Sequence, residues 1–283
     1  MRDLNKVGLV LEGGGLRGIF TAGVIDCLLD KNVEMDYVIG VSAGSCNAFE
    51  YIGKQRGYIK SCLIQKNKFE SFYGIPQMIE SHKYVDLDKV FDEYSKKYGF
   101  DYDAFINNPI EWEMVVSNIN TGKAEYMHSN NKDEAVLIGK ASCSLPGLTS
   151  PRQIGDYLYL DGGICDSIPV QRALDMGCDK VVVVLTRKKG NFSVTNEATK
   201  ILFRRLYAEY PEFVQALMDR NDLYVSQVKL AEELERQGKA VIIRPTMQEV
   251  GRLESDEQAL MLSYYHGYTK AKEYIDKIKD FKI

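Results

Sequence analysis

Histidine is scarce in this chain. The 283 residues include three, His82, His128 and His266, and none of them stands in a pattern typical of catalysis or metal binding. The six cysteines show no C-x-x-C spacing and no neighbouring pair of histidines, so the usual zinc signatures are missing. We expect reduced, buried thiols and no metal site.

The sequence also lacks long hydrophobic runs and an excess of basic residues. Lys and Arg number 36 against 40 Asp and Glu, which argues against a nucleic-acid partner. Residues 1–6 mix charges and lead into a short apolar run, unlike a signal peptide, and no segment approaches the roughly 20 apolar residues of a membrane-spanning helix. We expect a cytoplasmic protein with at most peripheral contact with a membrane.

No linker rich in Pro, Gly or Ser divides the chain. Hydrophobic residues make up 45% of it, enough for one sizeable core. We therefore expect residues 1–283 to form a single domain.

Two strand–turn–helix units occupy the first fifty residues. Val7–Leu11 is a short apolar run, and after a glycine-rich turn Ile19–Asp30 has apolar residues at helical intervals. Tyr37–Ile39 is a second strand-like run, followed by the turn Gly40–Gly44 and a helix over Ser45–Tyr51. Two such units predict an α/β fold with a parallel sheet.

The rest of the chain fits the same fold with a sheet of about six strands. Residues 54–108 show no strong strand pattern and predict helices and loops at one edge of the sheet. Glu212–Gln237 and the C-terminal tail have the spacing of amphipathic helices. The further predicted strands are Trp112–Ser117, Tyr157–Leu160, Val181–Leu185 and Val241–Ile243.

The second turn has the pattern G-x-S-x-G with Ser42 at its centre. This pattern between a strand and a helix is typical of a nucleophile elbow, in which the serine sits in strained backbone. Gly40 and Gly44 would prevent a steric clash there, and the helix N-terminus favours developing negative charge. The alternative is an ordinary glycine-rich turn in which Ser42 caps the helix.

The first turn is a second candidate site. Consecutive glycines let N–H groups converge on one anion, either an oxyanion or a phosphate. Arg17 could add positive charge to such a site or pair with a carboxylate of the following helix. The residues of the turn are Gly13, Gly14, Gly15, Leu16, Arg17 and Gly18.

Nucleotide-binding interpretations of this turn fail. Gly13, Gly15 and Gly18 match G-x-G-x-x-G, but the acidic residue that this fingerprint requires should end the second strand, whereas Asp36 precedes it. No Gly-Lys-Ser/Thr closes the turn, which excludes a Walker loop. An oxyanion hole beside a nucleophile accounts for both glycine turns.

A nucleophilic serine needs a base, and Asp161 is the better candidate. It follows the apolar run Tyr157–Leu160, and Gly162 and Gly163 allow a tight turn that leaves the carboxylate at the strand end. A plain Asp-Gly turn is the alternative. A Ser-His-Asp triad with His266 remains a minority interpretation.

Four ordered motifs resemble the patatin-like phospholipase family. They are a glycine-rich turn with a basic residue, a G-x-S-x-G turn, an A-S-x-x-x-P segment and a D-G-G turn. The resemblance is anchored from residue 7 to about residue 170. In this sequence the motifs occupy Gly13–Gly18, Gly40–Gly44, Ala141–Pro146 and Asp161–Gly163.

This resemblance implies a three-layer α/β/α fold with a mainly parallel central sheet. It also implies that Ser42 forms an acyl-enzyme, that Asp161 takes and returns the proton, and that N–H groups around Gly14 and Gly15 bind the oxyanion. Gly13 and Arg17 would complete the oxyanion hole, with Gly18, Gly162 and Gly163 supporting the motifs. The implied substrate is a lipid or small ester, and no cofactor is implied.

One position departs from the family pattern. Where the family commonly has asparagine six residues after the aspartate, this chain has Ser167. A serine can bond the loop less fully than an asparagine. An acyltransferase with the same residues, and a non-catalytic lipid-binding protein, remain as alternatives, and the oligomeric state stays open.

Two further groups of residues bear on lipid contact. The segments 187–192 and 202–207 mix basic and apolar residues as a membrane-facing patch would, but an ordinary solvated face with some core residues is the preferred interpretation. Five aromatic residues could line an acyl pocket, although core packing is their commoner role. They are Tyr51, Tyr58, Phe69, Phe72 and Tyr73.

Overall fold

The computed structural model describes residues 5–64, 72–74, 84–192 and 194–282. Its centre is one eight-stranded sheet with the order β5-β6-β3-β2-β1-β7-β8, and β4 pairs with β3. β3, β2, β1, β7 and β8 pair in parallel, whereas β4 and β6 run antiparallel to β3, and β5 runs antiparallel to β6. The strands are β1 (Val7–Leu11), β2 (Tyr37–Val41), β3 (Glu111–Asn118), β4 (Lys123–Met127), β5 (Arg152–Ile154), β6 (Tyr157–Asp161), β7 (Lys180–Val184) and β8 (Ala240–Ile243).

The central strands are continuous apolar runs. All five residues of β1 and of β2 are buried, and so are the last four residues of β7. Such runs are typical of parallel strands that are covered on both faces. Leu11 is paired with Gly40 of β2 and with Val184 of β7, so these strands end at the same level. The turns that follow them therefore meet at one edge of the sheet.

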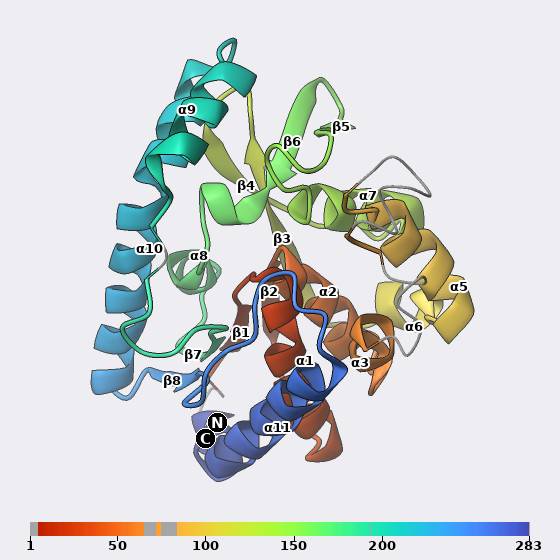
Figure 1. The fold of residues 1–283 in the computed structure, drawn as a ribbon. Helices are drawn as coiled ribbons and strands as arrows, with labels where there is room; N and C mark the ends of the chain where they lie inside the picture. The colour runs from red at the N-terminus through yellow and green to blue at the C-terminus, as the bar shows by residue number, and fades with distance from the viewer. Residues whose placement is uncertain (1–4, 65–71, 75–83, 193, 283) are drawn as a thin grey trace.

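Helices cover both faces of the sheet, as Figure 1 shows. On one face, α1, α2, α7 and α11 pack against strand residues such as Leu9 and Val182. On the other face, α8 and α10 pack against residues such as Val10 and Val183. The helices are α1 (Gly18–Asp30), α2 (Ala43–Ile52), α3 (Tyr58–Leu63), α5 (Tyr94–Tyr98), α6 (Tyr102–Ile106), α7 (Lys132–Ser142), α8 (Val170–Asp175), α9 (Glu197–Leu206), α10 (Pro211–Arg236) and α11 (Glu257–Lys279), with a π-helical turn over Lys89–Glu93.

These layers confirm the predicted α/β/α fold with a mainly parallel sheet, but the predicted number of strands was wrong. The sheet has eight strands instead of about six, because β4 and β5 were missed. Every residue of β4 is at least partly exposed, and β5 is three residues long, so neither produces a buried apolar run. Among the described residues, no helix combines the length and apolar composition needed to cross a bilayer.

Candidate active site

Ser42 lies at a sharp turn between β2 and α2. Its backbone angles are φ 54° and ψ −124°, a strained conformation for a residue with a side chain. A Cβ atom on Gly40 would lie 2.6 Å from the Gly44 carbonyl oxygen, and one on Gly44 would lie 2.2 Å from the Leu11 carbonyl oxygen. Glycine is therefore required on both sides of Ser42, as the geometry of a nucleophile elbow demands.

A buried serine that the sequence analysis did not single out supports this turn. The Ser42 N–H donates to the Ser142 hydroxyl oxygen at 2.9 Å. The Ser142 hydroxyl also lies 2.8 Å from the Ser45 hydroxyl, in the first turn of α2. Ser142 belongs to the A-S-x-x-x-P segment, so the motif was the one available signal for this positioning role.

We expect Ser142→Ala to lower both stability and turnover. The substitution leaves the Ser42 N–H and the Ser45 hydroxyl buried without their partner, which costs about 1–3 kcal/mol of unfolding free energy. A small displacement of Ser42 should lower kcat by about tenfold. Urea unfolding and ester hydrolysis measure the two effects.

Ser144→Ala is the matched control for this prediction. Ser144 is also fully buried, but its hydroxyl donates to the Lys140 carbonyl oxygen at 2.8 Å. The control should lose stability and keep its turnover. Equal turnover in Ser142→Ala and the wild-type protein would contradict the positioning role.

The glycine turn after β1 packs directly against the Ser42 turn. A Cβ atom on Gly13 would lie 2.9 Å from the Ser42 Cβ atom. A Cβ atom on Gly18 would lie 2.9 Å from the Ala43 Cβ atom. Gly15 has φ 59°, in the left-handed region that favours glycine. Within the described part of the chain, the N–H groups of Gly14 and Gly15 have no hydrogen-bond acceptor, as expected at the start of a helical turn.

Arg17 braces this glycine turn. Its side chain is buried, and its Nε donates to the Gly14 carbonyl oxygen at 3.3 Å. Burial, together with the neighbouring Arg187 and Arg252, lowers the pKa of Arg17 to about 10, so it remains charged at neutral pH. The alternative pairing with a carboxylate of α1 is not found among the described residues.

Asp161 ends β6, and its carboxylate is buried beside Ser42. Its Oδ1 accepts the Gly163 N–H at 2.8 Å, while its Oδ2 has no hydrogen-bond partner among the described residues. Burial raises the pKa of Asp161 above its ordinary value. The Ser42 hydroxyl, the Gly163 N–H and the guanidinium groups of Arg220 and Arg252 act on this pKa in the opposite direction.

Ser167 and Arg220 hold the loop that follows Asp161. The Gly163 carbonyl oxygen accepts the Ser167 hydroxyl at 2.7 Å and the Arg220 Nε–H at 2.6 Å. A Cβ atom on Gly162 would lie 2.1 Å from the Val115 carbonyl oxygen, so the loop packs tightly on β3. Arg220 thus adds a second bond where serine replaces the family's usual asparagine.

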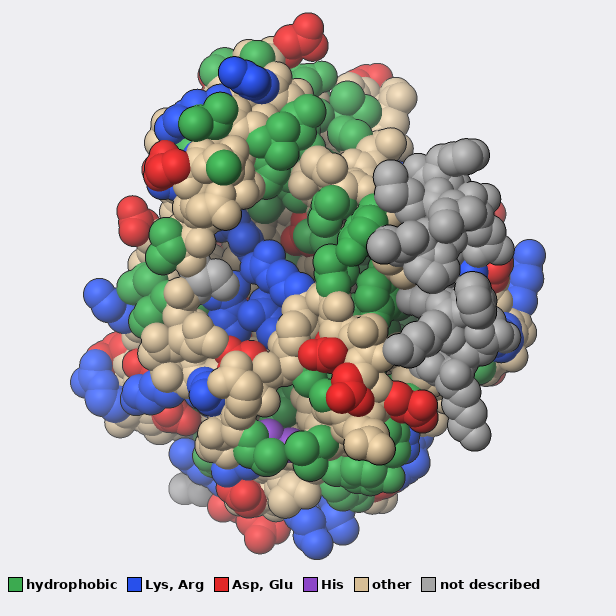
Figure 2. All heavy atoms as spheres, in the orientation of Figure 1, with side chains coloured by type: hydrophobic (Ala, Val, Ile, Leu, Met, Phe, Trp, Pro, Cys, Tyr) green, Lys and Arg blue, Asp and Glu red, His purple; other side chains and the backbone are tan. Residues whose placement is uncertain are grey.

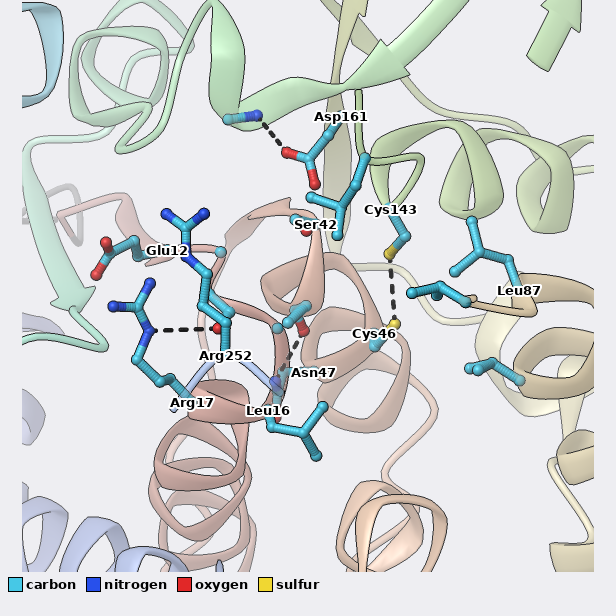
Figure 3. Close-up of a pocket in the computed structure, with 18 of the residues that line it drawn as sticks. Glu12, Leu16, Arg17, Ser42, Cys46, Asn47, Leu87, Cys143, Asp161 and Arg252 are labelled. Carbon is cyan, nitrogen blue, oxygen red and sulfur yellow. Dashed lines mark hydrogen bonds between the residues drawn. The ribbon is translucent and has the colours of Figure 1, made fainter. Parts of the chain in front are cut away.

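A cavity of about 320 Å³ brings these elements together. Figure 3 shows Ser42 and Asp161 between two groups of residues: Glu12, Arg17 and Arg252 on one side, and Cys46, Cys143 and Leu87 on the other. Beyond Cys46, Cys143 and Leu87, the cavity has an apolar wall formed by residues of α2, α3 and the segment before α6. The apolar side chains of that wall include Phe49, Tyr58, Phe72, Val85, Phe91 and Phe100.

Two of the five aromatic residues considered for an acyl pocket line the cavity. Tyr58 and Phe72 line the cavity, but Tyr51 does not, because it is buried in the core, where its hydroxyl donates to the Val33 carbonyl oxygen at 2.7 Å. Tyr73 is not among the lining residues, and Phe69 lies outside the described residues.

The described histidines lie away from Ser42. His266 lines a separate small pocket and is 3.1 Å from the Thr246 hydroxyl, whereas the His128 ring packs edge-on against Trp112. His82 lies outside the described residues. No described histidine lines the cavity of Ser42, so the structure gives no support to the triad with His266.

Two models of known protein families match this chain. The model of the family "Patatin-like phospholipase" matches residues 9–174, more than half of the chain. The chain belongs to the patatin-like phospholipase family. A second model, "Domain of unknown function (DUF6363)", matches residues 210–282, which include α10, β8 and α11.

The chain is also similar to curated proteins. "Uncharacterized protein YjjU" of Escherichia coli (strain K12) is 28% identical over 195 residues, covering 64% of this chain and 52% of YjjU. "Lysophospholipase NTE1" of Chaetomium globosum is 26% identical over 301 residues, covering 97% of this chain and 18% of that protein. The chain thus spans about half of YjjU and under a fifth of the lysophospholipase. Among solved structures, VipD from Legionella pneumophila matches with a TM-score of 0.49 and 14% identity, covering 97% of this chain and 67% of that chain.

Proposed function

We propose that the protein is a serine acyl hydrolase that cleaves lipid esters with Ser42 as nucleophile and Asp161 as general base. One observation carries the proposal: the strained Ser42 and the buried Asp161 line the same cavity, and one end of that cavity is apolar. An apolar pocket can bury an acyl chain while the ester carbonyl lies at the serine.

The reaction would proceed through an acyl-enzyme. Asp161 accepts the Ser42 proton as Oγ attacks the ester carbonyl carbon. The N–H groups of Gly14 and Gly15, which have no acceptor among the described residues, stabilise the oxyanion. The protonated Asp161 then gives the proton to the departing alcohol. In the second half, Asp161 activates water, which releases the fatty acid and restores Ser42.

A carboxylate is a weak base toward serine unless its surroundings raise its pKa. Burial of Asp161 raises its pKa and so makes its ionised form more basic. The oxygen Oδ2 has no other hydrogen-bond partner among the described residues, which leaves it available for the Ser42 proton. These two features support a dyad without histidine.

Peripheral contact with a membrane is a prediction that α9 supports. None of its ten residues is buried, and Ile201, Leu202 and Leu206 are exposed. Phe203 of the same helix lines the cavity, so α9 lies beside a route for a lipid into the site. Basic residues Arg204 and Arg205 in its last turn could contact anionic headgroups.

A fluorophosphonate probe tests the proposed function directly. We expect one probe molecule to phosphonylate Ser42, and digestion followed by mass spectrometry should locate the adduct on the peptide that contains it. Hydrolysis of p-nitrophenyl butyrate should stop in proportion to labelling. Heat-denatured protein is the control and should not react, because an unactivated serine is a poor nucleophile. Stoichiometric labelling of another serine would refute the proposal, and product analysis would separate hydrolysis from acyl transfer.

A further inference from the structure

Four arginines line the cavity around Ser42, and in the proposed reaction none of Arg187, Arg220 and Arg252 transfers a proton or binds the oxyanion. Arg187 follows β7, Arg220 lies on α10 and Arg252 precedes α11, whereas Arg17 belongs to the glycine turn. Figure 2 shows a group of Lys and Arg side chains within the hollow of the molecule. In Figure 3, Arg17 and Arg252 lie on the side of Ser42 away from Leu87.

The carboxylates of the cavity do not balance these charges. Glu12 and Asp161 are the acidic residues among the described lining residues, so two of the four positive charges have no carboxylate to compensate them. Glu12 is further occupied by Thr186, whose N–H and hydroxyl both donate to Oε2. Uncompensated charge in a partly desolvated cavity is costly, and an anionic ligand would remove that cost.

The Arg187 side chain is buried, yet one of its hydrogen-bond donors has no acceptor among the described residues. Its side chain is 6% exposed and stacks on the Tyr224 ring, with the guanidinium carbon 4.6 Å from the ring centroid. Its Nε has no hydrogen-bond partner among the described residues and lies 3.9 Å from the nearest Glu12 oxygen, beyond hydrogen-bond distance. A buried guanidinium group with a free donor is unusual unless a ligand supplies the acceptor.

Arg220 and Arg252 also have guanidinium N–H groups that bond to no described residue. Arg220 uses its Nε to bond the Gly163 carbonyl oxygen, and its terminal nitrogens have no acceptor among the described residues. Arg252 is solvent-exposed, yet lines the same cavity, and its side chain likewise makes no hydrogen bond to a described residue. Burial, and next the neighbouring Arg252, lower the pKa of Arg220 to about 10, so it too stays charged at neutral pH.

The cavity therefore has a cationic end and an apolar end, with Ser42 between them. An ester with an apolar acyl chain and an acidic group on its alcohol part would match both ends. Guanidinium groups bind phosphate oxygens in pairs of parallel hydrogen bonds, a geometry that a neutral alcohol cannot use.

We propose that Arg187, Arg220 and Arg252 form a headgroup subsite that selects acyl esters carrying a phosphate close to the scissile bond. The inference rests on the proposed acyl hydrolase function and names its substrate class. Two of the three arginines belong to residues 210–282, the segment matched by the model of unknown function. That segment would then supply the substrate selectivity for the catalytic residues Ser42 and Asp161, which precede it in the chain.

The first test compares two substrates that differ in the phosphate alone, octanoyl lysophosphatidic acid and monooctanoylglycerol. The wild-type protein should have the higher kcat/KM for the phosphate ester. Arg252→Gln should lower the ratio of the two kcat/KM values by about 10-fold to 100-fold, and Arg252→Lys by less, because lysine keeps the charge without the planar fork. Arg252 is exposed, so both variants should fold, which circular dichroism checks.

Arg236→Gln is the matched control. Arg236 is an exposed arginine at the end of α10 that does not line the cavity, and its loss should leave the ratio unchanged. An unchanged ratio in both Arg252→Gln and Arg187→Gln would overturn the proposal. Arg220→Gln is less informative because Arg220 also holds the loop of Asp161.

Inorganic phosphate distinguishes a headgroup site from a site for the free ion. Phosphate should inhibit hydrolysis of p-nitrophenyl butyrate competitively, and less so in Arg252→Gln. If phosphate inhibits while the wild-type protein shows no preference for the phosphate ester, the arginines bind free phosphate and the headgroup assignment is wrong.

A binding measurement keeps the subsite testable if no ester is hydrolysed, the result that would refute the proposed function. Calorimetry with the Ser42→Ala protein should detect tighter binding of octanoyl lysophosphatidic acid than of monooctanoylglycerol. Adding Arg252→Gln should remove most of that difference. Equal binding of the two lipids would overturn the subsite on its own.

Discussion

Replacing Ser42 with alanine should reduce kcat/KM for ester hydrolysis by about 10⁴-fold or more, because the acyl-enzyme can no longer form. The fold should persist, since alanine removes one hydroxyl group and keeps the Ser42 N–H bond to Ser142. Turnover of p-nitrophenyl esters of short and medium chain length measures the loss, and circular dichroism checks the fold.

Two control variants make this result specific. Ser226 is an exposed-surface serine of α10 whose hydroxyl donates to the Leu223 carbonyl oxygen, and Ser226→Ala should keep full activity. His266→Ala should also keep it, because His266 does not line the cavity. Residual activity in folded Ser42→Ala protein would place the nucleophile elsewhere, and loss of activity in folded His266→Ala protein would revive the triad.

Much of the fold could be predicted because the central strands are covered on both faces. Burial on both faces selects uninterrupted apolar runs, and β1 and β7 are visible in the sequence for that reason. β4 lies beside β3 with every residue at least partly exposed, so its sequence, Lys-Ala-Glu-Tyr-Met, has no buried run to detect. The signal for it was the turn at Gly122, whose positive φ of 65° joins β3 to β4.

The candidate site was predictable where steric constraints fix the residue type. Gly40 and Gly44 have no room for a Cβ atom, so the turn around Ser42 leaves a readable motif. A cluster of charged side chains requires no fixed spacing of residues along the sequence. Arg187, Arg220 and Arg252 come from three separate elements, and their convergence depends on how those elements pack.

Arg187 illustrates the limit of pattern analysis. The sequence placed it with Lys188 and Lys189 in a basic segment that fits a solvated face or a membrane patch. The structure corrects this for Arg187, which is 5% exposed and lies against Tyr224, whereas Lys189 is exposed. Neighbouring positive residues look alike in a sequence, and tertiary packing alone decides which of them enters the cavity.

Asp161→Asn should lower kcat/KM by about 10³-fold or more, because an amide cannot accept the Ser42 proton. In the wild-type protein, kcat/KM should fall as the pH is lowered through the raised pKa of Asp161, since protonation removes the base. The residual activity of Asp161→Asn should lack this decline. A pH–rate profile of both proteins, in a buffer of constant ionic strength, makes the measurement.

The same substitution should stabilise the fold at neutral pH. Because burial raises the pKa of Asp161, the folded state binds more protons than the unfolded state between the ordinary and the raised pKa. Unfolding free energy therefore falls as the pH rises through that window and stays lower above it. Asparagine removes this cost, so the thermal midpoint of Asp161→Asn should exceed that of the wild-type protein at neutral pH and match it more closely in acid.

Asp166→Asn separates catalysis from burial of charge. Burial raises the pKa of Asp166 to about 6, and its carboxylate accepts bonds from Tyr126 and Gln227 without lining the cavity. This variant should change the pH dependence of stability while turnover persists. If Asp161→Asn stays active, the base lies elsewhere. If it is inactive and also less stable than the wild-type protein at neutral pH, Asp161 serves the loop it caps, and its raised pKa is no measure of basicity toward Ser42.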